Sequence, residues 1–207
     1  MADAYNRRSA LQHFGLTAAA AKSDAAGADL LIGESAHRAI VNIRGDGGEA
    51  FKAAVKAVTG LDLPVTPNTT AQAGSGAGDF RILWLGPTEW WIVTTGGSEE
   101  KLVADLRQAF NGQHAAVIDV SESRTVITLS GPGARDVLAR GCSLDLHPRV
   151  FGPGQCAQTG LTKANIMLDQ IDGTPTYDVY VLKSFADYLW QWLGLIGRDY
   201  KFAIRAH

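Results

Sequence analysis

The sequence predicts an α+β fold built from two repeated halves, and three observations support this prediction. A pattern of segments in residues 39–64 recurs in residues 125–148, short apolar runs have strand character, and other segments have helical spacing. Each copy joins a β-branched run, a glycine-containing turn, a helix-patterned segment and Leu-Asp-Leu with proline close behind. We therefore expect two ferredoxin-like β-α-β-β-α-β halves with antiparallel sheets, each covered on one face by helices.

The chain divides into an arm and two halves. Residues 1–29 form an N-terminal arm or linker in this interpretation, because they show no sustained period of two or 3.6 and would order only by docking. The first α+β half covers residues 30–120 and the second covers residues 121–207, with the join near residues 112–124.

In the first half, the segment after Gly48 has a helical period. Its apolar face is expected to pack on a sheet and consists of Phe51, Ala54, Val55 and Val58. Residues 80–95 then give two strand-like runs about Gly86-Pro87, and Ser98 opens a second helix. That helix carries Leu102, Val103, Leu106 and Phe110.

The second half ends on the clearest helix of the sequence. Residues 155–171 and 176–182 supply strands, and Ser184 is expected to cap the helix that follows. Its apolar residues form one continuous stripe, which we expect to be the packed face: Phe185, Tyr188, Leu189, Trp192, Leu193 and Ile196. Trp190 lies off this stripe.

Composition excludes several classes of protein. The chain has 207 residues, of which 46% are hydrophobic and 19% charged, and a net charge of -2, so no basic surplus indicates nucleic-acid binding. The longest apolar stretch, Tyr188 to Ile196, is shorter than the roughly 20 residues of a membrane span. Cys142 and Cys156 lack CxxC spacing, so we expect a reduced cytoplasmic compartment. Arg7-Arg8 is followed by too broken an apolar segment to indicate export.

Five blocks, in order, give the chain a family resemblance. They are Arg8-Ser9-Ala10-Leu11 and residues 85–93, 117–151, 154–161 and 177–193. Together they resemble the gamma subunit of bacterial heterotetrameric sarcosine oxidase, over most of the chain outside the alanine-rich arm and residues 66–79. That family is similar to the tetrahydrofolate-binding aminomethyltransferase fold, so the resemblance implies an aminomethyltransferase-like architecture.

The resemblance also implies a function. It indicates a gamma subunit that binds alpha, beta and delta subunits, mainly alpha, in a complex that oxidatively demethylates sarcosine. The products are glycine, hydrogen peroxide and 5,10-methylenetetrahydrofolate. In that family FAD, FMN and NAD belong to alpha and beta, tetrahydrofolate to alpha and zinc to delta. The expectation for this chain is a structural subunit without catalytic, cofactor-binding or metal-binding residues.

The glycine-rich turns are consistent with a chain that holds no cofactor. Gly45-Asp46-Gly47-Gly48 and Gly131-Pro132-Gly133 approach the dinucleotide motif without completing its spacing, and Asp46 would place negative charge where a phosphate must lie. Both are expected to be structural turns. Residues 73–78 lack the Lys-Ser/Thr pair of a phosphate-binding loop.

Metal and nucleophile signals are weak. Cys142, His147 and Cys156 lack a fourth ligand for a closed zinc site, which favours buried thiols and a loop histidine. Ser121, Ser123 and Ser130 lie outside any Gly-x-Ser-x-Gly elbow.

Asp119 and Glu122 lie close in sequence to Arg124, and this is where a retained folate or acid-base site would fall. The favoured interpretation is a structural ion pair at the link between the halves. The early catalytic aspartate motif and the additional domain of the aminomethyltransferases have no match in this sequence, which argues against independent folate chemistry.

Five tryptophans indicate covered surfaces. Trp90 and Trp91 point to opposite faces of a strand, so both sheet faces should be covered. Trp190 is either an exposed ring at a subunit interface or is packed beneath the arm, and the sequence does not decide between these two interpretations. The residues expected to contact a partner are Trp84, Trp90, Trp91, Trp190 and, on the arm, Leu11.

The sequence is compatible with two alternative functions. One is a stand-alone tetrahydrofolate-binding domain for one-carbon transfer, which predicts binding of a reduced folate by the isolated chain. The other is the equivalent subunit of a complex that acts on another N-methyl amino acid, such as N-methylglutamate. The sequence of a gamma chain alone does not separate sarcosine from such a substrate.

Overall fold

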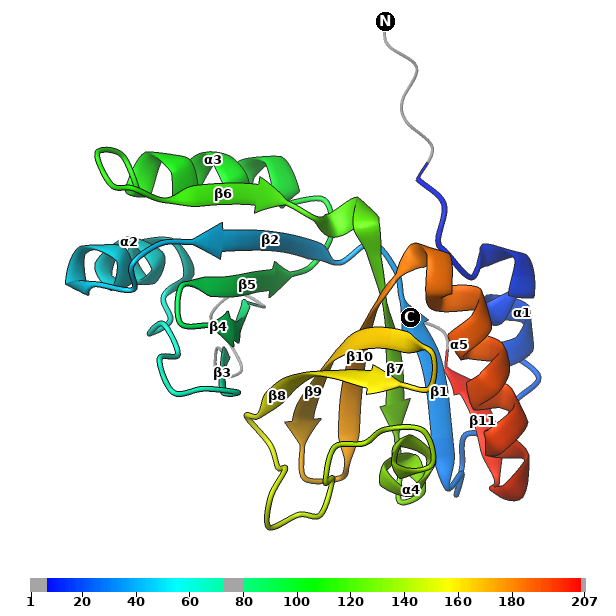
Figure 1. The fold of residues 1–207 in the computed structure, drawn as a ribbon. Helices are drawn as coiled ribbons and strands as arrows, with labels where there is room; N and C mark the ends of the chain where they lie inside the picture. The colour runs from blue at the N-terminus through cyan, green and yellow to red at the C-terminus, as the bar shows by residue number, and fades with distance from the viewer. Residues whose placement is uncertain (1–6, 73–79, 206–207) are drawn as a thin grey trace, which may run out of the picture.

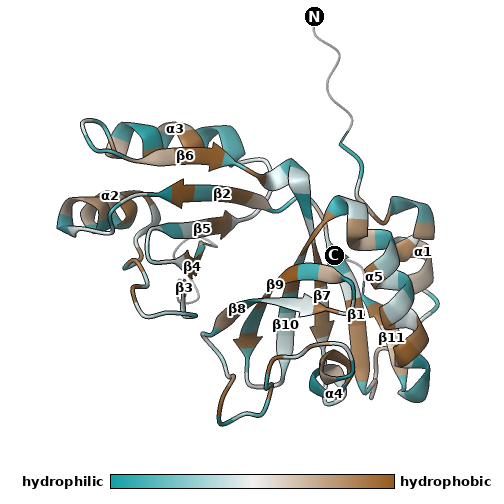
Figure 2. Ribbon diagram, in the orientation of Figure 1, coloured by the Kyte–Doolittle hydropathy of each residue, from teal (hydrophilic) through white to brown (hydrophobic). Residues whose placement is uncertain are grey.

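Two β-sheets with helices on their outer faces make up the computed structural model, which describes residues 7–72 and 80–205 (Figure 1). The inner faces of the sheets meet in an apolar cluster that includes Leu83, Trp91, Met167 and Tyr180. Colouring by hydropathy shows apolar residues along β2, β1 and β7 and polar residues on the outer turns of α3 (Figure 2). The predicted mixed α+β class with antiparallel sheets is confirmed.

The five-stranded sheet has the order β3-β4-β5-β2-β6, and all its neighbouring strands are antiparallel. Its elements are β2 (Ala39–Arg44), α2 (Glu49–Thr59), β3 (Thr70–Gln72), β4 (Arg81–Gly86), β5 (Glu89–Thr94), α3 (Glu99–Ala109) and β6 (Ala116–Asp119). Helices α2 and α3 bury their predicted apolar faces against this sheet, where Phe51 stacks on Phe110 with ring centroids 4.5 Å apart.

The six-stranded sheet has the order β11-β1-β7-β10-β9-β8. Its elements are β1 (Leu30–Ser35), β7 (Arg124–Ser130), α4 (Ala134–Ala139), β8 (Cys156–Leu161), β9 (Ala164–Asp172), β10 (Thr176–Leu182), α5 (Lys183–Ile196) and β11 (Phe202–Arg205). Strand β1 lies between β11, to which it is parallel, and β7, to which it is antiparallel. The structure therefore places β1, which falls in the first expected half, in the sheet of the second half.

The N-terminal arm docks on the six-stranded sheet and its helix. It forms η1 (Gln12–Phe14) and α1 (Leu16–Ala20), with Leu11 fully buried. The ring of Phe14 lies 6.2 Å from that of Trp190, and His13 Nε2 lies 2.7 Å from a carboxylate oxygen of Asp187. Leu11 thus anchors the arm in the core, with Ala10, Phe14 and Leu16 packed against it.

Helix α5 is rotated relative to the face predicted from its sequence. Its buried residues are Ala186, Leu189, Trp190 and Leu193, whereas Phe185 and Tyr188 are exposed. Trp190 lies off the predicted stripe but is buried, because the docked arm covers that side of the helix. Of the two interpretations left open for Trp190, packing beneath the arm is therefore the one that the structure confirms. Ser184 lies inside the helix, which begins at Lys183 without a side-chain cap.

The glycine turns before α2 and α4 have packing roles. A Cβ at Gly45 would overlap the ring of Phe51. Gly131 has a φ of 104°, and a Cβ there would lie 2.6 Å from the carbonyl oxygen of Asp29. The Asp46 carboxylate accepts a hydrogen bond of 2.8 Å from the Gly48 N–H, which any phosphate at this turn would need. These contacts support the predicted structural turns; residues 73–78 lie outside the described part of the chain.

Among the described residues, no helix is long and apolar enough to cross a membrane.

Candidate functional site

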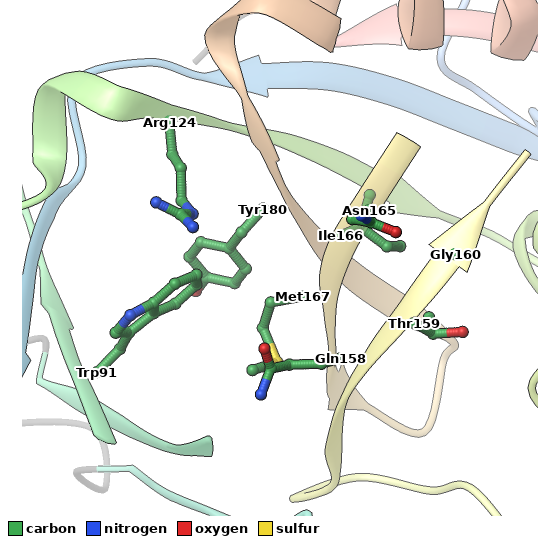
Figure 3. Close-up of a pocket in the computed structure, with 9 residues that line it drawn as sticks. All are labelled: Trp91, Arg124, Gln158, Thr159, Gly160, Asn165, Ile166, Met167 and Tyr180. Carbon is green, nitrogen blue, oxygen red and sulfur yellow. The ribbon is translucent and has the colours of Figure 1, made fainter. Parts of the chain in front are cut away.

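A pocket of about 400 Å³ lies between the two sheets (Figure 3). Five strands line it: β5 with Trp91, β7 with Arg124, β8 with Gln158, Thr159 and Gly160, β9 with Asn165, Ile166 and Met167, and β10 with Tyr180. An adjoining hollow of about 340 Å³ shares Trp91, Arg124 and Gln158 and extends towards β6. Residues from both sheets therefore form one continuous groove.

Arg124 carries the charge of this pocket. It is the first residue of β7, directly after the short η2 helix (Ser121–Ser123), and its side chain is half-buried. The guanidinium carbon lies 4.6 Å from the centroid of the Trp91 ring, and Nη1 donates a hydrogen bond of 2.9 Å to Ser123 Oγ. Burial lowers the pKa of the Arg124 guanidinium. No carboxylate of the described residues pairs with it.

The two carboxylates expected beside Arg124 have other partners. Glu122 is 2.6 Å from Arg7 Nε and 2.7 Å from Lys183 Nζ, and the hydrogen bonds from Lys183 and Arg7 lower the pKa of its carboxyl group. Asp119 accepts hydrogen bonds from the Ser121 N–H and hydroxyl. The expected pairing with Arg124 is wrong, because the η2 turn directs these carboxylates elsewhere, but both have structural roles at the link.

A buried ion pair joins the two sheets beside the pocket. Arg81 of β4 makes a two-pronged contact with Asp169 of β9, and both side chains are buried. The guanidinium also donates to Gln72 and to the Gln170 carbonyl oxygen. Burial raises the pKa of Asp169 to about 6, and the opposing effect of Arg81 only partly offsets it. Arg38 lies 3.7 Å from the neighbouring carboxylate of Asp178.

The Tyr180 hydroxyl and the Cys156 thiol also lie between the two sheets. The Tyr180 hydroxyl is buried and has no hydrogen-bond partner among the described residues, and burial raises its pKa well above the usual value. Burial likewise raises the pKa of the Cys156 thiol to about 12, so this thiol stays protonated near neutral pH and cannot act as a thiolate nucleophile.

The candidate interface residues are mostly internal. Leu11, Trp90 and Trp190 are buried in the two sheet–helix cores, and Trp90 donates a hydrogen bond of 2.8 Å to the Pro64 carbonyl. Trp91 points to the opposite face of β5, as predicted, and is buried at the pocket. Trp84 is partly buried against the core of the five-stranded sheet. These positions give little surface to a partner.

The candidate metal ligands do not assemble. Cys156 is buried between the sheets, Cys142 packs against the core of the six-stranded sheet, and His147 is exposed. No group of three or more His, Cys, Asp or Glu side chains positioned to hold a metal occurs within the described residues.

Sequence reasoning missed the pocket and the ion pair. Gln158, Asn165 and Tyr180 lie on strands whose register cannot be read from the sequence. The ion pair had a visible signal, since Arg81 and Asp169 interrupt apolar runs that become strands. A charged residue inside such a run indicates a buried partner.

The fold by itself indicates a structural class. The chain superposes on the crystal structure of the glycine cleavage system aminomethyltransferase T from Bartonella henselae, with a TM-score of 0.62 and 17% identity over 86% of this chain and 48% of that one. At this identity the likeness concerns the fold alone. The architecture is therefore aminomethyltransferase-like, as the sequence predicts.

The family is shown by closer relatives. Residues 44–197 match the model of the sarcosine oxidase, gamma subunit family. The sarcosine oxidase subunit gamma of Arthrobacter sp is 35% identical over 187 residues, which cover 90% of this chain and 88% of that one. A chain of the heterotetrameric sarcosine oxidase from Corynebacterium sp. U-96 in complex with pyrrole 2-carboxylate superposes with a TM-score of 0.82 and 30% identity, over 97% of this chain and 99% of that one. The chain belongs to the sarcosine oxidase gamma subunit family.

Proposed function

We propose that this chain is the gamma subunit of a heterotetrameric sarcosine oxidase and that its role is structural. The observation that carries the proposal is the end-to-end similarity to a chain of the Corynebacterium complex, in which 97% of this chain and 99% of that one align. In such a complex the chain associates with alpha, beta and delta subunits, principally alpha, in the cytoplasm.

The proposed complex oxidatively demethylates sarcosine to glycine, with formation of hydrogen peroxide and 5,10-methylenetetrahydrofolate. FAD, FMN, NAD, tetrahydrofolate and zinc are assigned to the other subunits. The side chains of this chain support a structural role. The two carboxylates weighed as a possible acid-base site, Asp119 and Glu122, make hydrogen bonds and ion pairs within this chain, and Cys156 stays protonated.

We propose further that the two halves, residues 30–120 and 121–207, are ferredoxin-like repeats. The strand order β4-β5-β2-β6 with helices α2 and α3 supports this for the first half. In the second half β9-β10-β7 follows the same order, and β1 is inserted before β11. The insertion of β1 couples the halves, since a strand from the first segment completes the second sheet.

The partner surface is assigned to the outer face of α5 instead of Trp190. Three of its large apolar residues are exposed, namely Phe185, Tyr188 and Leu195. Tyr188 and Leu195 border a hollow of about 850 Å³ that also includes Phe14 of the docked arm. A cluster of exposed apolar residues beside a concave surface is typical of a protein interface.

The subunit proposal is tested by affinity purification of this chain from its native host, with mass spectrometry and an absorbance spectrum. We expect three further subunits, a flavin spectrum and sarcosine-dependent peroxide formation. Recovery of a single, colourless chain that binds reduced folate would overturn the proposal in favour of an independent one-carbon protein.

The docking face is tested separately with two matched variants. Leu195 and Val65 are both 57% exposed, but only Leu195 lies on α5. Leu195→Asp is expected to lower recovery of the partner subunits at least about tenfold, since it places a charge in an apolar contact. Val65→Asp should leave recovery unchanged. Equal recovery with both variants would exclude this face of α5 while leaving the subunit proposal intact.

A further inference from the structure

The pocket between the sheets contains a charge that no acidic side chain of the described residues neutralises. Among the described residues that line it, Arg124 is the one charged side chain, and the other eight are neutral. The adjoining hollow adds Arg44 and Glu89, which lie 3.2 Å apart and balance each other. A half-buried cation is costly unless it is paired or hydrogen-bonded. The Trp91 ring offsets part of that cost through a cation–π contact at 4.6 Å.

Most of the hydrogen-bonding capacity of Arg124 is unused. A guanidinium has five N–H donors in a planar fork, and within the described chain the side-chain bond to Ser123 accounts for one of them. Figure 3 shows the guanidinium directed towards Trp91 and Tyr180, with Thr159 and Asn165 on the far side of the hollow. The Asn165 side chain is exposed and has no hydrogen-bond partner among the described residues, and the Tyr180 hydroxyl also lacks one.

We propose that this pocket is a binding site for a small organic carboxylate, whose carboxyl group pairs with the Arg124 fork. A carboxylate matches the paired N–H groups of a guanidinium, and one negative charge balances the one cation of the lining. A phosphate dianion would leave a negative charge without a partner. The volume of about 400 Å³ is within the usual range for small ligands.

The walls limit the rest of the ligand. Met167 is apolar, whereas Gln158 and Asn165 present polar groups. The side chains of Ile166 and Thr159 face the other side of the sheet, where Ile166 packs in the outer core and Thr159 Oγ1 lies 3.6 Å from Cys142 Sγ. The Gln158 amide donates one hydrogen bond of 2.9 Å to the Leu85 carbonyl, which leaves its oxygen and second N–H, like the Asn165 amide, for a second polar group of the ligand. The site therefore fits a compact body with a single carboxylate. It does not depend on the subunit role, because all its residues come from this chain.

The test uses the full chain labelled with ¹⁵N at its tryptophan indoles, titrated with benzoate and with the neutral isostere benzamide at constant ionic strength. We expect benzoate to shift the Trp91 indole signal, assigned with Trp91→Phe, with an affinity at least about tenfold above that of benzamide, because bonds to charged groups are the stronger ones. Equal affinity for the two probes would overturn an Arg124-directed site.

Variants separate the charge from the shape of the pocket. Arg124→Gln is expected to weaken benzoate at least about tenfold, and Arg124→Lys to weaken it less, since the charge remains but the fork is lost. Arg149→Gln, which changes an exposed arginine outside the pocket, should have no effect. Benzoate binding that survives Arg124→Gln would overturn the proposal.

A second variant keeps the test valid if Arg124→Gln fails to fold. Gly160 lines the hollow, and a Cβ on it meets no atom within 4 Å, so Gly160→Leu would fill the space and is expected to abolish the shift.

The titration is then repeated on the purified complex. A shift in the free chain that disappears in the complex would overturn the ligand site in favour of an acidic side chain of a partner.

Discussion

The two faces of β5 place adjacent tryptophans in different surroundings. Trp90 lies in an apolar core with Phe51 and the helices α2 and α3, and its ring is 5.5 Å from that of Phe51. Trp91 lies between the sheets, beneath the Arg124 guanidinium and 5.9 Å from the Tyr180 ring. The outer face is stabilised by apolar burial, whereas the inner face joins two sheets through a mixture of apolar contacts, buried charge and a polar pocket.

This difference separates two physical roles. Apolar packing on the outer face is non-directional and contributes in proportion to the area buried. The ion pair between Arg81 and Asp169 contributes little net stability, because both charges lose their hydration, but it is strongly directional. We therefore expect the outer face to determine whether each half folds and the inner face to determine how the halves fit together.

The largest expected effect tests this difference directly. Trp90→Ala should lower the free energy of unfolding by about 4–5 kcal/mol, since a fully buried ring and its hydrogen bond to Pro64 are lost. Trp91→Ala should cost about 2–3 kcal/mol, because water can enter from the adjoining pocket. Urea unfolding measures both, and equal losses would contradict the distinction between the two faces.

The next effect concerns the buried ion pair. Asp169→Asn should destabilise the chain by about 3 kcal/mol, the lower end for a broken buried pair, because Gln72 and the Gln170 carbonyl still accept bonds from Arg81. The double variant Arg81→Met with Asp169→Leu removes both charges and should recover most of this loss. If the double variant were less stable than Asp169→Asn, the ion pair would be a net source of stability.

A pH dependence follows from the same carboxyl group. The pKa of Asp169 is raised to about 6, against about 3.9 in an unfolded chain, so the folded state binds this proton more tightly. Its contribution to stability is therefore greatest below about pH 4 and falls by about 2 kcal/mol as the pH rises to about 6. The measurement is the free energy of unfolding of the native chain and of the double variant between pH 4 and 7. The value for the native chain minus that for the double variant should fall as the pH rises, and an increase would contradict the raised pKa.

The sequence predicts the elements of the fold better than their partners. The apolar spacing of residues 51–58 and the two runs about Gly86-Pro87 correspond to α2, β4 and β5. The orientation of α5 was predicted wrongly, because the sequence of one helix gives the position of its apolar residues but not which of two apolar sides the arm covers. Leu11 and Phe14 decide that, from more than 170 residues away.

The site was less predictable for a related reason. Arg124 was singled out with two nearby acids, yet the short η2 turn directs Glu122 to Arg7 and Lys183 and leaves Arg124 above Trp91. Proximity in sequence does not give the direction of a side chain in a tight turn. The insertion of β1 between β11 and β7 likewise depends on long-range strand pairing, for which a single sequence carries no local signal.

The smallest expected effect contrasts an exposed ion pair with the buried one. Glu122 is 49% exposed and holds Arg7 of the arm and Lys183 of α5, so Glu122→Gln should cost about 0.5 kcal/mol, close to the median for surface pairs. Because these partners lower the pKa of Glu122, its contribution is present above about pH 4 and is lost on acidification, opposite to that of Asp169. Glu49→Gln, which breaks the ion pair of a 92% exposed Glu49 with Lys52 on α2, is the control and should change stability less. A loss above about 2 kcal/mol for Glu122→Gln would mean that this contact, and not the burial of Leu11, holds the arm. Charged contacts would then orient the arm as well as the two sheets.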